Sequence, residues 1–347
     1  MAISDVQFFQ GWKQVLGMCN LKPGEQVTIL TSDDSNRQIA SIARLAASDM
    51  GAIVSVLNLA PMNGEKAISR DKSGYIGKTP LEGNSAALAC LKASDMVIDT
   101  IQLLFSREQE EVLKTGARML LAVEPPEVMM RMIPKPEDKA RVLAAAKKIG
   151  AAKKMTVTSV AGTDFSCDIG QYPVLTQYGL ADEPGRWDHW PSCFAATWPN
   201  EGSAEGTIVI DEGDILLPFK MYARDPITVT IEKGIIRDIK GGFDAEFMRK
   251  FMESFNDPRA YAMAHVGWGL HTRAHWTVLG LYNPEAQLGM DARSFAGNFL
   301  WSSGPNTEAG GDRDVPCHLD IPLRNCSLSL DGEAMTIDGR VVNEDQR

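Results

Sequence analysis

The fold is decided near the start of the chain, where residues 27–59 read VTILTSDDSNRQIASIARLAASDMGAIVSVLNL. The apolar run at 27–30 is typical of a buried strand, and residues 53–59 indicate a second strand. The segment between them places Ile39 and Ile42 on one face of a helix. The residues expected to cap the start of this helix are Asp33, Asp34 or Ser35. The stretch therefore predicts an α/β fold.

The alternation of strand and helix continues to about residue 150. Strands are expected at 96–101 and 119–123. Between them, Ser106 followed by Gln109 forms a capping-box pattern for a further helix. The alanine-rich, basic stretch 139–148 predicts a surface helix. These elements together predict an α/β N-terminal domain over residues 1–154.

The pattern of apolar and polar residues changes after about residue 155. Short alternating runs are separated by the turn dipeptides Lys233-Gly234, Asp331-Gly332 and Asp338-Gly339, which are hairpin signals. One helix is expected at 245–255, where phenylalanines spaced four apart favour core packing over a cofactor site. The sequence thus predicts a β-rich, α+β C-terminal domain over residues 155–347.

Composition excludes several classes of protein. The chain has 347 residues, with 44% hydrophobic and 23% charged, the balance of a soluble globular protein. Its net charge of −10 argues against nucleic-acid binding, which needs a basic surface. No apolar run is long enough to span a membrane, and no secretory signal pattern is present, so a cytoplasmic location is expected. The six cysteines form no CxxC pair, which favours reduced, mostly buried thiols.

The sharpest chemical feature is His318-Leu319-Asp320. Residues two apart on a strand share one face, so this His and Asp can converge on one cation. With one more histidine they would form a two-histidine, one-carboxylate set that suits iron(II) and leaves positions open for substrate and oxygen. The alternative is that His318 and Asp320 simply bond to each other.

Two other places in the chain offer histidines for such a site. His265 lies in Ala-His-Val-Gly-Trp-Gly, where glycines allow close backbone approach, although a lone histidine among apolar neighbours is often a core residue. His271 and His275 are four apart as in the His-Glu-x-x-His motif, but Thr272 replaces the glutamate and Arg273 would repel a cation. This pair is interpreted as a solvated or hydrogen-bonded face.

Two further segments offer groups for a substrate. His189 lies between two tryptophans, in Arg-Trp-Asp-His-Trp, and is either an acid–base group beside a flat ring or an aromatic core element. The polar, glycine-rich loop 302–311 begins with Ser302 and Ser303, which are candidates for hydrogen bonds to a substrate. No Gly-rich nucleotide-binding pattern is present.

Taken together, long segments of the chain resemble the 2,5-dihydroxypyridine 5,6-dioxygenases. The similarity spans essentially the whole chain, and its segments are idiosyncratic enough to exclude chance. The segments that carry it are Leu-Ala-Val-Glu-Pro-Pro-Glu-Val (121–128), Asp-Glu-Pro-Gly-Arg-Trp-Asp-His-Trp-Pro-Ser (182–192), 198–206, 304–308 and Pro-Cys-His-Leu-Asp-Ile-Pro-Leu-Arg-Asn-Cys (316–326).

The resemblance implies an extradiol-like, ring-cleaving dioxygenase that uses iron(II), Fe(2+), to convert 2,5-dihydroxypyridine and O2 to N-formylmaleamic acid. It places the iron ligands on His265, His318 and Asp320 and the acid–base histidine on His189. The implied partners are therefore a small N-heterocyclic diol and O2, and we also expect a homo-oligomer.

One position departs from the family pattern. The family carries a histidine after the paired leucines that follow the third strand, and this chain has Phe105 after Leu103-Leu104. Phe105 could stack on a pyridine ring but could not transfer a proton. We therefore expect Phe105 to line the substrate site, and we hypothesise that it slows the reaction.

A more distant resemblance is to thermophilic aminopeptidases, which share the two-domain build. The alternative function is therefore an aminopeptidase-like metallohydrolase with a two-metal site. That function would need extra carboxylates beside His318, for which Glu201, Glu205 and Glu308 are candidates. A non-catalytic binding protein is a third alternative, and it predicts no bound transition metal.

Overall fold

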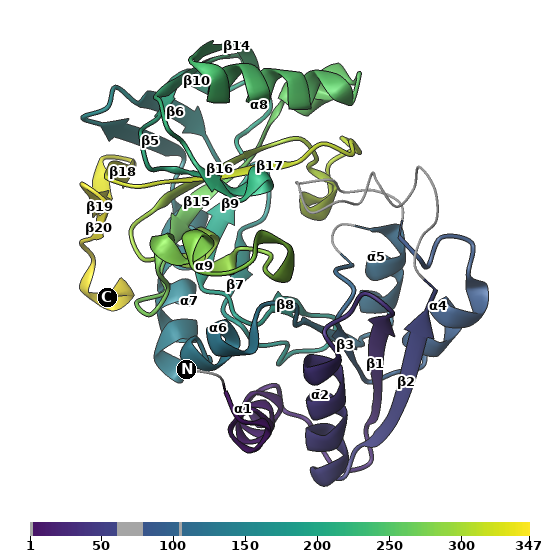
Figure 1. Cartoon of the computed structure of the whole chain (residues 1–347). Helices are drawn as coiled ribbons and strands as arrows, with labels where there is room; N and C mark the ends of the chain where they lie inside the picture. The colour runs from purple at the N-terminus through teal and green to yellow at the C-terminus, as the bar shows by residue number, and fades with distance from the viewer. Residues whose placement is uncertain (1–2, 61–78, 104–105) are drawn as a thin grey trace.

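The computed structural model describes residues 3–60, 79–103 and 106–347, and its first half is built on a parallel sheet (Figure 1). The strand order is β2-β1-β3-β4-β8. The strands are β1 (Gln26–Ser32), β2 (Ile53–Leu59), β3 (Met96–Asp99), β4 (Arg118–Leu121) and β8 (Trp187–His189). The helices are α1 (Asp5–Met18), α2 (Arg37–Asp49), α4 (Ser85–Lys92), α5 (Arg107–Leu113), α6 (Pro126–Arg131) and α7 (Pro136–Ala151). This arrangement confirms the expected α/β class.

The cap of α2 differs from the prediction. Asn36, not a residue in 33–35, caps the helix, and its side chain accepts from the backbone N–H groups of Gln38 and Ile39. The hydroxyl of Ser35 is engaged elsewhere, since it accepts from the backbone N–H of Ser32 and donates to the carbonyl of Thr100, just after β3. The apolar face is as expected at Ile39, which is fully buried.

Strand β8 crosses the predicted domain boundary. It follows residue 155 in the chain, yet it pairs in parallel with β4, with Leu121 opposite His189. The next residue, Trp190, packs edge-on against Trp12 of α1, with ring centroids 4.9 Å apart. The division at 154/155 therefore marks a change of sheet type, and its status as a domain boundary stays a prediction.

The second half is antiparallel, as expected. An eight-stranded sheet has the order β14-β13-β10-β6-β5-β18-β19-β20, and a five-stranded sheet has the order β17-β16-β15-β9-β7. The strands of the first are β5 (Lys154–Ser159), β6 (Asp164–Asp168), β10 (Glu205–Ile210), β13 (Ile227–Glu232), β14 (Ile235–Gly241), β18 (Cys326–Leu330), β19 (Glu333–Ile337) and β20 (Arg340–Val341). Those of the second are β7 (Leu175–Gln177), β9 (Phe194–Thr197), β15 (Met263–Gly269), β16 (Phe299–Ser303) and β17 (Leu319–Leu323). A small pair, β11 (Ile215–Leu216) and β12 (Met221–Tyr222), completes the strands.

The three hairpin signals are confirmed. Lys233-Gly234 joins β13 to β14, Asp331-Gly332 joins β18 to β19, and Asp338-Gly339 joins β19 to β20. Both residues of each pair have positive φ, as a tight turn between antiparallel strands requires. The local sequence therefore specified these turns correctly.

Both expected helices are present. In α8 (Phe243–Ser254) and just after it, Phe251 and Phe255 pack against the core as predicted, whereas Phe247 is 40% exposed and packs edge-on against Phe219. The expected surface helix is the longer α7, which keeps one face exposed and on the other lies against β7 and β9 and buries Val142. The exposure of Phe247 shows that the burial of each phenylalanine depends on the neighbouring layer and not on spacing alone.

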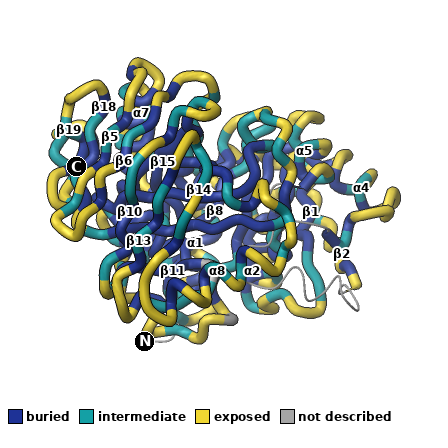
Figure 2. Tube along the Cα trace, turned by 90° about the horizontal axis from the view of Figure 1, so that it is seen from above, coloured by how far each residue is buried: buried dark blue, intermediate teal, exposed yellow. Residues whose placement is uncertain are grey.

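Buried segments concentrate in the strands (Figure 2). All six cysteines are free thiols, and Cys90 is the one that is not fully buried. In the described ranges, no helix is long and apolar enough to cross a membrane.

Candidate metal centre

The five-stranded sheet brings three metal-ligand side chains together. His265 lies on β15, Asp320 lies on β17, and His318 directly precedes β17. Strand β16 separates the two strands, and the β15 register shifts between Met263 and Val266, where His265 lies. Such a bulge redirects a side chain, and here it lets His265 reach across β16 to His318 and Asp320.

The donor atoms of His265, His318 and Asp320 all lie within 4.8 Å of one another. The two Nε2 atoms are 2.9 Å and 3.1 Å from Asp320 Oδ1, respectively. All three residues are 5% exposed or less. Despite these short distances, Oδ1 has no well-aligned hydrogen bond. A buried carboxylate oxygen facing two imidazole nitrogens without such a bond fits a metal ion as the shared partner.

The neighbouring serines hold the two histidines in place. The Nδ1–H group of His318 donates to the carbonyl oxygen of Ser303 at 3.1 Å, so its Nε2 lone pair faces the cluster. The hydroxyl of Ser302 donates to the carbonyl oxygen of His265 at 3.1 Å. Both serines thus act on the metal-ligand residues, whereas their predicted contact with substrate stays a prediction.

Arg293 was missed by sequence reasoning. It lies on the short helix α9 (Met290–Ser294), and its guanidinium is 2.5 Å from Asp320 Oδ2. Burial alone would raise the pKa of Asp320, but Arg293, His318 and His265 together outweigh it and hold that pKa well below its usual range, with Arg293 the largest of the three contributions. No motif surrounds Arg293 in the sequence, so only the fold reveals its partner.

The surroundings of His265 and His189 favour the neutral imidazole. Burial lowers the pKa of His265, although Asp320 opposes the shift. Burial, together with the positive charge of Arg293, lowers the pKa of His189 well below its usual value. Neutral imidazole is the form that binds a metal or accepts a proton.

His189 lies beside the cluster. It lines a small cavity of about 30 Å³ together with His265, Arg293, Asp320 and Trp187, and its Nε2 has no hydrogen-bond partner. The remaining lining residues, which sequence reasoning also missed, are Leu175, Gln177, Phe194 and Met290.

Asp188, the neighbour of His189 in the chain, bonds to backbone groups and to Arg186 and not to the His189 ring. Its carboxylate accepts from the backbone N–H groups of Tyr178, Gly179 and His189 and pairs with Arg186 at 2.6 Å. Asp188 therefore fixes the backbone of β8 and of residues 178–179. Phe105, which was predicted to line the substrate site, lies outside the described residues.

The alternative ligands do not gather into a second site. His271 is bonded through Nδ1 to the backbone N–H of Arg273, and His275 is exposed, so the pair shares no helix face. Glu201 pairs with Arg313, and Glu205 accepts from a backbone N–H group. Among residues 3–60, 79–103 and 106–347, the His265, His318 and Asp320 set is the one group of at least three such ligands.

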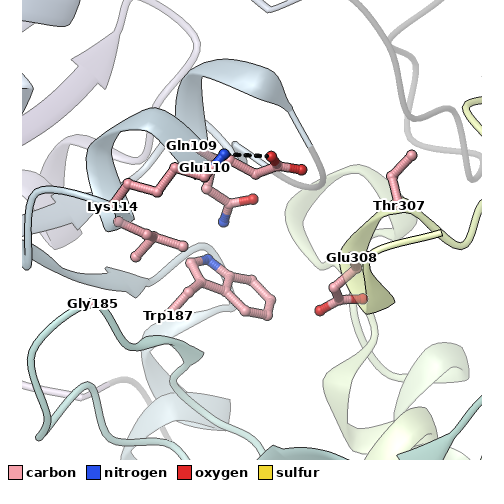
Figure 3. Close-up of a pocket in the computed structure, with 9 residues that line it drawn as sticks. Gln109, Glu110, Lys114, Gly185, Trp187, Thr307 and Glu308 are labelled. Carbon is pink, nitrogen blue, oxygen red and sulfur yellow. Dashed lines mark hydrogen bonds and ion pairs between the residues drawn. The ribbon is translucent and has the colours of Figure 1, made fainter. Parts of the chain in front are cut away.

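A larger cleft of about 500 Å³ adjoins the small cavity. It lies between α5, the start of β8 and the short helix η5 (Thr307–Ala309). Trp187 lines both spaces, and Figure 3 shows it opposite Glu308 across the cleft. The cleft is of a size that small-molecule sites commonly have.

Comparison with known proteins agrees with this geometry. A family model described as 2,5-dihydroxypyridine 5,6-dioxygenase matches residues 7–343. The chain belongs to this family. A 2,5-dihydroxypyridine 5,6-dioxygenase of Pseudomonas putida is 52% identical over 342 residues, covering 99% of this chain and 98% of that protein.

Solved structures extend the comparison. The structure of the 2,5-dihydroxypyridine dioxygenase from Pseudomonas putida KT2440 matches with a TM-score of 0.97 and 51% identity, covering all of both chains. AmpT from Thermus thermophilus matches with a TM-score of 0.64 at 12% identity, covering 97% of this chain and 99% of that one. The second match confirms the expected aminopeptidase-like fold and shows nothing more than the fold.

Proposed function

We propose that this member of the family is an iron(II)-dependent enzyme that opens the ring of 2,5-dihydroxypyridine with O2 and yields N-formylmaleamic acid. The observation that carries the proposal is the convergence of His265, His318 and Asp320 in a buried site of a chain that belongs to this family. Two imidazoles and one carboxylate suit iron(II) and leave adjacent coordination positions for other ligands.

The protein residues have separate tasks in this proposal. His265, His318 and Asp320 would hold the metal, which when bound supplies the means to bring a ring and O2 together and exchange electrons with them. The Ser303 carbonyl and Arg293 orient two of these ligands. His189, neutral and with a free Nε2, is placed to take a proton from a substrate hydroxyl and to return it later.

Oxygen consumption tests the proposal. Protein reconstituted anaerobically with iron(II) should consume O2 when 2,5-dihydroxypyridine is added, and His318→Ala should not. His275→Ala is the matched control, because His275 is an exposed histidine outside the cluster. Wild-type protein that binds iron but leaves the substrate and O2 unchanged would refute the activity.

The peptidase alternative is tested by metal analysis. Two zinc or cobalt ions per chain together with peptide hydrolysis would favour it. The geometry favours a single metal, because Glu201 and Glu205 are engaged elsewhere and Glu308, the third candidate, is not part of the His265, His318 and Asp320 group. The cytoplasmic location and the homo-oligomer stay predictions, and light scattering on the purified protein tests the second.

A further inference from the structure

The space around the ligand cluster is too small for a ring. The cavity at His189 and Asp320 has a volume of about 30 Å³, which is close to the volume of one water molecule in the liquid. The neighbouring cleft of about 500 Å³ shares Trp187 with it. A flat ligand whose one end approaches the cluster therefore needs further room, and the cleft that shares Trp187 offers it.

Glu308 brings an acidic group without a protein partner to the cleft. Its Oε2 is buried and makes no hydrogen bond, as is also true of Trp187 Nε1, and the Glu308 side chain points toward Trp187 in Figure 3. Burial, with a contribution from the negative charge of Asp320, raises the pKa of Glu308 to about 8. Buried polar atoms without a partner are rare, so an atom of this kind facing a cleft indicates a ligand.

The other charged groups of the cleft are already paired with each other. Glu110 on α5 and Lys114, which directly follows that helix, form an ion pair of 3.3 Å (Figure 3), and Leu113 between them is apolar. The remaining lining therefore suits a neutral, flat molecule. Glu308 offers hydrogen bonds to one edge of such a molecule.

A neutral carboxyl group presents an O–H donor and a carbonyl acceptor side by side. Their complement is a cis-lactam, whose ring N–H donates and whose carbonyl oxygen accepts. The pyridone form of 2,5-dihydroxypyridine carries this edge at the ring nitrogen and C2, and its 5-hydroxyl lies at the opposite end of the ring.

We propose that Glu308 binds the lactam edge of the substrate, with the ring against Trp187 and the 5-hydroxyl end toward His265, His318 and Asp320. The proposal rests on the proposed function for the identity of the substrate. Glu308 is then a specificity-determining residue that selects pyridines with an oxygen at C2.

The test uses two probes, each of which carries one end of the substrate. 2-Pyridone has the lactam edge alone, and 3-hydroxypyridine has the hydroxyl end alone. Their binding to the full-length, iron-loaded protein is measured anaerobically by titration calorimetry. The variants are Glu308→Leu, which loses both hydrogen bonds, and Glu308→Gln, which keeps a neutral donor and acceptor. Glu137→Leu is the matched control, because Glu137 is an exposed glutamate on α7 that lines neither the cleft nor the small cavity.

We expect Glu308→Leu to weaken 2-pyridone binding about tenfold, the loss typical of hydrogen bonds of this kind. Glu308→Gln should bind 2-pyridone within about threefold of wild type, since its amide restores the pairing. Binding of 3-hydroxypyridine should be unchanged in both variants, and Glu137→Leu should bind both probes as wild type does.

Three results would overturn the proposal. These are wild-type affinity of Glu308→Leu for 2-pyridone, a Glu308→Gln variant as weak as Glu308→Leu, and a loss of both probes in Glu308→Leu. A different result would refute the proposed function. Wild-type protein that binds 2-pyridone through Glu308 but does not consume O2 with 2,5-dihydroxypyridine would refute the activity and leave this site intact.

Discussion

Arg293 controls the charge of the candidate metal ligand set. Its guanidinium lies 2.5 Å from Asp320 Oδ2, and its Nε is buried without a hydrogen-bond partner. A carboxylate that is kept ionised and fixed in one orientation binds a cation more tightly than one that must first lose a proton. Arg293 thus supports the cluster without belonging to it.

Arg293→Met should therefore weaken iron binding about 10- to 100-fold, as is typical when a group that orients a ligand is lost. The dissociation constant is measured by anaerobic iron titration. The control is Arg259→Met, which removes a surface arginine paired with Asp257. Unchanged iron affinity in Arg293→Met would show that Asp320 does not depend on this ion pair.

His189 should affect turnover and not metal binding. His189→Gln removes the neutral imidazole beside the cluster, and kcat should fall about 10²- to 10⁴-fold, the range for loss of a general acid–base group. The iron content should stay at the wild-type level, since His189 is not in the ligand set. A variant that retains wild-type kcat would exclude His189 from proton transfer.

At the scale of the elements, Glu124 connects the parallel sheet to α9. This buried carboxylate follows β4 and accepts from the backbone N–H groups of Gly289 and Met290 at 2.8 and 2.7 Å, and from that of Leu288 at 3.2 Å. It caps the start of the helix that carries Arg293. The position of Arg293 therefore depends on a residue of the first half of the chain.

Glu124→Gln should loosen α9, because the amide NH2 group would face backbone donors and leave at least one of them unsatisfied, at a cost of about 1–3 kcal/mol. Faster hydrogen exchange in residues 288–294 and weaker iron binding are expected together. Glu127→Gln on α6 is the control. Wild-type exchange in this segment would contradict the role of Glu124.

Local sequence patterns predicted the strands and turns better than they predicted the contacts between distant segments. The strands near 27–30 and 53–59 and the three hairpins follow from short-range residue preferences, and the structure confirms them. His318 and Asp320 could be paired from strand periodicity alone. Arg293 and Glu124 act through contacts between segments far apart in the sequence, and no local pattern reports such contacts.

At the scale of the whole molecule, the two halves are interlocked. β8 leaves the β-rich half to become the edge of the parallel sheet, and it carries Trp187 and His189 to the site. Trp190 then packs on Trp12. The site thus lies where the parallel and antiparallel sheets meet, which the change of texture near residue 155 could not reveal.

A fragment of residues 1–154 should therefore fail to fold cooperatively. It lacks β8, which pairs with β4, and leaves the face of α7 that lies against β7 and β9 exposed. Thermal unfolding followed by circular dichroism should show a broad, weak transition beside the sharp one of the full chain. A sharp transition in the fragment would establish residues 1–154 as an independent domain.

The central claim is that two imidazoles and one carboxylate hold a single iron ion. Its most direct test is the iron content of anaerobically reconstituted protein after removal of free metal. Wild-type protein and His275→Ala should each retain a single iron ion per chain, and Asp320→Ala should retain almost none. Iron retained by Asp320→Ala, or a second metal ion in the wild-type protein, would contradict the account.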